Sequence, residues 1–243
     1  MEDRGLTLRR AAVMLALAGV ILAFMAGFGA VVDVAPQRFE WFYELDQYTN
    51  DLRAASGLIK ILIFFDNFFV LVYTTAVILL VWGFRIGRPG YLCAIAAGGI
   101  VMTALLDYVE NFHFVIMLRA LDSAEPLTAA QVMFQMHASL LKWHAAYLSL
   151  FMLSFVLPQD SLNERVVVWS LRLLVPAVGH AVAVASLDVV PVLLALRTTV
   201  FVIGFAMMAL IAWGRAQQQQ GPPRVETATA TPGRDDTSQR TGT

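Results

Sequence analysis

The sequence predicts an all-α protein, a polytopic membrane helix bundle of about six transmembrane helices with both termini in the cytoplasm. Of the 243 residues, 58% are hydrophobic and only 14% are charged, and the mean hydropathy is +0.67. A soluble domain is about half apolar and about a quarter charged. A spanning helix needs about 20 mostly apolar residues, and six stretches of the chain meet that length.

The six apolar stretches occupy most of the chain. We place the spans at about 11–32, 59–84, 91–118, 130–157, 166–187 and 191–213. They predict one integral membrane bundle over residues 1–215, and the polar composition of residues 216–243 predicts a disordered cytoplasmic tail. The first stretch follows Arg9 and Arg10, as a signal peptide would. Its apolar run of about 20 residues exceeds the 7–15 of a signal core, so we expect it to be retained.

The short connections alternate in charge, which predicts the orientation. Arginines precede the first span, join spans two and three and spans four and five, and follow the sixth: Arg4, Arg9, Arg10, Arg85, Arg88, Arg165 and Arg215. The opposite connections are richer in acidic residues. Because cytoplasmic loops carry the excess of Lys and Arg, the arginine-rich face should be cytoplasmic. We therefore expect a multi-pass protein of a cell membrane, such as the bacterial inner membrane.

The outer loop at 33–57 is longer than a simple connection. Pro36 precedes Phe39, Phe42, Tyr43 and Asp46, which recur at helical spacing. The pattern predicts either a short helix lying on the outer membrane surface or a packed loop that caps the bundle. A lid over an outward-facing cavity is a further hypothesis, since long loops are often functional.

Ionisable residues inside the spans mark a candidate site. A charge at mid-membrane costs about 2.5–3.5 kcal/mol and usually faces the bundle interior. Lys142, one of two lysines, lies near the middle of the fourth stretch, and Asp107 lies near the middle of the third. Helix geometry puts Glu110 and Asn111 on the same face as Asp107.

The fourth stretch carries two polar stripes, one with Lys142 and one with His137 and His144. They lie about 140–160° apart around a helix, so they cannot both face the same neighbour. We expect Lys142 to meet the acidic residues, because a buried unpaired ammonium costs more than a neutral imidazole. The sequence thus predicts a buried pair between Asp107 and Lys142.

The candidate ligand- or proton-binding residues fall near mid-bilayer or in the outer half of the membrane, so the site would open outward. They are Asp66, Asn67, Asp107, Glu110, Asn111, Lys142 and Arg197. Glu110 and Asp66 could pair with Arg197, whose depth is similar. The structural alternative is that these pairs only hold the helices in register. Tyr73 is interpreted as a packing residue.

Two functional hypotheses follow, and a structural or assembly subunit remains as a third. In the first, the protein binds or transports a small solute or ion with proton coupling, and the buried carboxylates exchange protons while Lys142 is the counter-charge. Pro176 is then a candidate break in span five. In the second, a metal held by His113, His137 and His180, with Glu110 or Asp66, activates water in a membrane-embedded enzyme acting on a lipid or small apolar substrate.

Several function classes are not supported by the sequence. The net charge of −1 supplies no basic surface for nucleic acid. No phosphate-binding glycine motif, Cys-x-x-Cys or His-Glu-x-x-His occurs. The expected partners are the lipid bilayer, a small molecule or ion, and a second copy of the chain. The candidate cofactor is a metal ion, with a haem between two histidines as a lesser variant; no catalytic residue can be assigned.

Overall fold

Six long apolar helices make up the protein, seen here in a computed structural model that describes residues 4–31, 36–41, 43–185 and 189–219. All six are long and apolar enough to cross a membrane, so the prediction of an all-α, multi-span membrane protein is confirmed. The spans are α1 (Arg4–Val31), α3 (Ser56–Phe84), α4 (Gly90–Asp122), α5 (Ala129–Val156), the pair α6 (Leu162–Trp169) and α7 (Val175–Val184), and α8 (Val190–Gln218). Most of these helices extend a few residues beyond the predicted spans.

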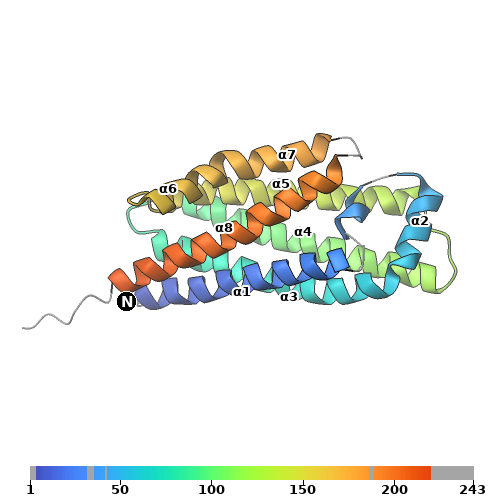
Figure 1. Cartoon of the computed structure of the whole chain (residues 1–243), viewed down its shortest axis with the longest axis horizontal. Helices are drawn as coiled ribbons and strands as arrows, with labels where there is room; N and C mark the ends of the chain where they lie inside the picture. Colours follow the sequence, from blue (N-terminus) through green and yellow to red (C-terminus); the bar gives the residue numbers. More distant parts are fainter. Residues whose placement is uncertain (1–3, 32–35, 42, 186–188, 220–243) are drawn as a thin grey trace, which may run out of the picture.

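The spans run alongside one another along the length of the molecule, with the N-terminus at one end and the short helix α2 (Leu45–Ala54) across the other (Figure 1). α4 packs on α5, and α1 packs on both α3 and α8. Large apolar side chains such as Phe64, Phe112 and Leu210 are exposed, at 70%, 67% and 72%. Asp107 and Arg197 are buried. Apolar groups outside and charged groups inside suit a bundle surrounded by lipid.

Close contact between α4 and α5 depends on a glycine. A Cβ atom at Gly99 would lie 2.9 Å from the Cβ and 3.1 Å from the Cα of Ser149. The neighbouring Gly98 faces open space. Ser149 also donates a hydrogen bond to the carbonyl of Ala96 at 2.7 Å. The small residue therefore lets two helices that carry charged residues approach closely.

The fifth span is irregular where the sequence contains Pro176. A wide π-helical turn, η2 (Ser170–Leu174), separates α6 from α7. Proline has no N–H to donate to the carbonyl four residues earlier, and a single π turn next to it changes the local hydrogen-bond pattern. Arg172 in this turn donates to the hydroxyl and carbonyl oxygens of Ser154 at 3.0 and 3.2 Å, so the irregular segment is bonded to α5.

The segment predicted to be the outer loop forms two short helices that pack on one end of the bundle. A 3₁₀ helix, η1 (Pro36–Glu40), is followed by α2, whose first turn is capped by Glu44. Tyr48 and Leu52 of α2 are fully buried against α3 and α4. The loop is thus a packed cap. Phe42 and Asp33, which the sequence places in this loop, lie outside the described residues.

The cap is also held by polar contacts at its surface. Arg38 and Asp51 form an exposed ion pair at 2.6 Å, and Tyr43 donates to the same carboxylate at 3.2 Å. Burial, and then the neighbouring Asp51 carboxylate, raise the pKa of Tyr43 to about 12. Tyr43 therefore keeps its proton at neutral pH and remains a donor to Asp51.

The arginine-rich connections gather at the end opposite α2. Arg4 donates to the carbonyl of Gly83 at 2.7 Å, and Arg88 donates to that of Leu157 at 3.1 Å. Arg215 forms ion pairs at 2.6 Å with both Asp160 and Glu164. α8 continues to Gln218, past the predicted start of the polar tail at 216. The predicted tail otherwise lies outside the described residues from 220 onward.

Candidate functional site

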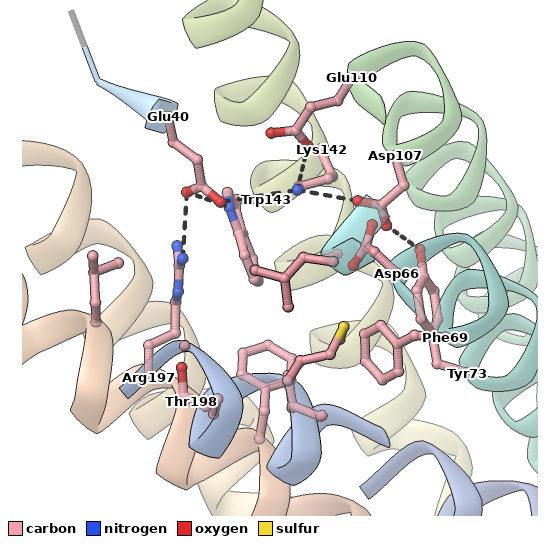
Figure 2. Close-up of a pocket in the computed structure, with 18 of the residues that line it drawn as sticks. Glu40, Asp66, Phe69, Tyr73, Asp107, Glu110, Lys142, Trp143, Arg197 and Thr198 are labelled. Carbon is pink, nitrogen blue, oxygen red and sulfur yellow. Dashed lines mark hydrogen bonds and ion pairs between the residues drawn. The ribbon is translucent and has the colours of Figure 1, made fainter. Parts of the chain in front are cut away.

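A cavity of about 860 Å³ lies between the helices, lined by residues of α1, α3, α4, α5, α8 and η1. Its volume falls in the range of pockets that hold small organic ligands. The charged side chains that line its interior are shown in Figure 2: Glu40, Asp66, Asp107, Glu110, Lys142 and Arg197. They come from the short helix η1 and four spans, so the site exists only in the folded bundle.

Lys142 on α5 lies at the centre of the charged residues. Its Nζ atom is 3.0 Å from Oδ1 of Asp107 and contacts the carboxylate of Glu110. Glu40 is at 4.0 Å. The pair predicted between Asp107 and Lys142 is therefore present in the structure. The stripe that carries His137 and His144 is exposed on the outside of the bundle, as the angular separation on the helix requires.

Neutral donors complete the surroundings of the two carboxylates paired with Lys142. Tyr73 on α3 donates to Oδ2 of Asp107 at 2.5 Å. Gln135 donates to Oε1 of Glu110 at 3.2 Å, and the hydroxyl of Ser139 donates to the same oxygen. Gln135 and Ser139 lie one turn apart on α5, and Lys142 follows within another turn, so one face of α5 binds Glu110. Each carboxylate accepts charged and neutral hydrogen bonds, as buried carboxylates require.

Asp66 occupies a different position in the same cavity. The side-chain amide of Asn111 donates to Oδ2 of Asp66 at 2.7 Å and to the side-chain oxygen of Asn67 at 3.1 Å. These three predicted residues therefore meet between α3 and α4. Asp66 takes part in no ion pair with any cationic side chain that the structure describes.

Arg197 pairs with Glu40, which corrects the expected partner. Its Nη2 atom is 3.3 Å from Oε2 of Glu40, and its guanidinium carbon is 3.6 Å from the ring centre of Trp143. Trp143 Nε1 donates to the same Glu40 oxygen at 3.0 Å. Pairing with Glu110 was wrong because Glu110 is already bound by α5 side chains, whereas η1 folds back far enough to reach α8.

Three residues of the site were not anticipated from the sequence. Glu40 was counted only as one of several acids in the outer loop, Tyr73 was assigned to packing, and Trp143 was not considered. The excess of acidic over basic residues between 33 and 57 was the available signal for Glu40. No signal in the sequence indicated the partners of Tyr73 or Trp143, since both depend on how neighbouring helices are rotated.

The three histidines named as metal candidates lie in separate surroundings. His113 Nε2 is 2.9 Å from the carbonyl of Gln131. His137 Nδ1 lies 2.6 Å from the carbonyl of Met133, and His180 Nδ1 lies 2.7 Å from that of Pro176, each one turn earlier on its own helix. Within the described part of the chain, no three His, Cys, Asp or Glu side chains are grouped so that they could hold a metal ion.

The cavity interior is rich in acid. Among the described residues that line it, four carboxyl groups face Lys142 and Arg197, and the remaining lining arginine, Arg38, pairs with Asp51 at an exposed position. With every group ionised, these four carboxylates and two cations carry a net charge of −2. Like charges so close together in a medium of low dielectric constant repel strongly. The arrangement is therefore suited to hold protons or a cation.

No protein-family model matches this chain, and no curated protein or solved structure shows significant similarity to it. The sequence and the fold place it among multi-span membrane proteins with a buried charged network. The cavity and its charges are the basis for proposing what it does.

Proposed function

We propose that this protein binds a small cationic or protonatable solute in its cavity and exchanges it for protons, as a transporter in the membrane that it spans. The observation that carries the proposal is the excess of carboxylates over cations in a buried cavity. Ionisable residues are costly within a membrane, and in membrane proteins they commonly mark ion pathways and proton relays.

Competition between protons and solute would follow from the charge balance. With no solute bound, the excess charge is relieved by protons on the carboxyl groups. A cationic solute relieves the same repulsion, so its arrival releases protons and its departure takes them up. Lys142 remains the fixed counter-charge between Asp107 and Glu110, and its contacts rearrange as those groups change charge.

The positive-inside rule assigns the two ends of the bundle. The end that carries Arg4, Arg88 and Arg215 would face the cytoplasm, and α2 would face the opposite side. We expect a cysteine at the exposed position of Asp46 on α2, in a Cys93→Ser background, to react with a membrane-impermeant maleimide in intact cells. Reaction only after the cells are opened would reverse this orientation.

The transport proposal is tested with purified protein in liposomes that enclose a pH-sensitive dye. A pH gradient is imposed, and inorganic cations, organic amines, anions and neutral solutes are added in turn. We expect a cationic solute to dissipate the gradient. Asp107→Asn and Glu110→Gln should reduce the rate to that of protein-free liposomes, because each removes a carboxylate that holds Lys142 and exchanges protons.

Asp122→Asn is the matched control for these variants. Asp122 forms an exposed pair with Lys60 at 2.8 Å, away from the cavity, so its loss should leave the rate unchanged. A folded wild-type protein that dissipates no gradient with any class of solute would overturn the transport proposal. Full activity of both cavity variants would instead remove the carboxylates from the mechanism.

A further inference from the structure

The cavity has a second, apolar side that inorganic cations would leave unused. Side chains of α1 and α8 form much of it, and they are Leu22, Met25, Phe201, Phe205 and Met208. The volume of about 860 Å³ is far larger than an ion or a few water molecules require. A ligand that fills it must bury hydrocarbon as well as present a charge.

An aromatic wall connects this apolar side to the carboxylates. Phe69 lies 5.0 Å from Tyr73 and 6.0 Å from Phe205, measured between ring centres. Phe205 and Phe201 are 6.4 Å apart, and Phe201 is 5.8 Å from Trp143. The faces of such rings attract organic cations, more strongly when water is excluded.

Asp66 lies where this aromatic wall adjoins the carboxylates of the cavity. Asp66, Phe69 and Tyr73 are spaced three and seven residues apart on α3, so they share one helix face, and Figure 2 shows all three beside the cavity. Asp107 and Glu110 are bound to Lys142, and Glu40 is bound to Arg197. Asp66 accepts only a neutral amide among the described side-chain hydrogen bonds, so its charge is the one open to a ligand.

We propose that the ligand is a hydrophobic organic cation, with its charged centre between Asp66 and Phe69 and its hydrocarbon groups against Phe201 and Phe205. This assignment rests on the proposed function in one respect, that the cavity takes up a solute. A small inorganic cation would leave the apolar side unfilled, and an anion would face the excess carboxylates.

The test is equilibrium dialysis of the detergent-purified full chain against tetraphenylphosphonium, with protein-free micelles as background. Tetraphenylborate has nearly the same shape and the opposite charge, triphenylphosphine oxide is neutral, and tetramethylammonium has the charge without the bulk. We expect saturable binding of tetraphenylphosphonium alone. Asp66→Asn should weaken it about 10- to 100-fold, the effect of one charge at close range in a partly buried site.

Two further variants test the contribution of the aromatic ring and the specificity for the cavity. Phe69→Leu keeps the apolar bulk and removes the ring face, and should weaken binding about 3- to 10-fold. Asp122→Asn, outside the cavity, should bind as the wild type does. Asp66→Asn keeps a side-chain oxygen that can accept the hydrogen bond from Asn111, so this variant should elute from size exclusion as the wild type does.

The outcomes separate this inference from the transport proposal. Equal binding of tetraphenylborate or the phosphine oxide, or wild-type binding by Asp66→Asn, would overturn the ligand assignment. Failure of tetraphenylphosphonium to bind, with a small amine still dissipating the pH gradient, would also overturn it and leave transport standing. Binding without any gradient dissipation would support the ligand class and remove the transport proposal.

Discussion

Replacing Lys142 with methionine should destabilise the protein by about 3–5 kcal/mol, the cost of removing one partner from a buried ion pair. Methionine has a similar length and leaves little void. Asp107 keeps the hydrogen bond from Tyr73, and Glu110 keeps those from Gln135 and Ser139. Neither retains a cation within bonding distance among the described residues, so two carboxylates remain buried without compensation.

The measurement is the free energy of unfolding from reversible SDS titration in mixed micelles. Lys60→Met is the matched control. Lys60, the other lysine of the sequence, forms an exposed ion pair with Asp122, and such pairs contribute about 1 kcal/mol or less to stability. A loss at Lys142 no larger than that at Lys60 would contradict a compensating role for Lys142.

The pairing itself is tested by a double-mutant cycle. Asp107→Asn added to Lys142→Met should restore part of the lost stability, because it removes one of the stranded charges. The coupling energy for residues in direct contact is about 0.5–3 kcal/mol. A double variant no more stable than the worse single variant would show that Asp107 and Lys142 do not depend on each other.

Replacing Arg197 with methionine should destabilise the protein by about 2–4 kcal/mol, and replacing it with lysine should cost less but still be measurable. Arg197 is 3% exposed and lies 3.3 Å from Glu40 and 3.6 Å from the ring centre of Trp143. Lysine keeps the charge but loses the planar group that stacks on the indole. Methionine loses both contacts, and Glu40 keeps only the hydrogen bond from Trp143 and the more distant Lys142 at 4.0 Å.

Arg38→Met provides the control for this variant in the same part of the molecule. Arg38 also pairs with a carboxylate at the outer cap, but its side chain is 55% exposed, so its loss should cost about 1 kcal/mol or less. Both are measured by SDS titration. Equal effects of Arg38→Met and Arg197→Met would mean that the Arg197, Glu40 and Trp143 contacts do not hold the cap to α8.

Helix geometry predicted both the side of α5 that faces the site and the partner of Lys142 on α4. Lys142 and the histidine stripe are separated around the helix, and desolvation favours burying the paired ammonium. That argument needed only spacing and charge. It led to the Asp107 pair that the structure contains at 3.0 Å.

The same reasoning failed for Arg197 because depth alone does not determine a partner. Glu110 and Asp66 lie at a suitable level, yet Glu40 reaches Arg197 from an outer segment 157 residues away in the chain. Glu40 on η1 comes within bonding distance of Arg197 only when α2 packs its Tyr48 and Leu52 on the bundle. A loop path of this kind leaves no periodic signal.

The sequence by itself determined the six spans, their apolar surfaces and the ionisable residues buried within them. These properties are local, because a spanning helix satisfies its own backbone hydrogen bonds and its composition must match lipid. Only the tertiary structure decided that Arg197 meets Glu40, that Asp66 pairs with no cation among the described residues, and that an aromatic wall adjoins it. Those contacts depend on the rotation and spacing of helices that are distant in sequence, set by packing such as that of Gly99 against Ser149.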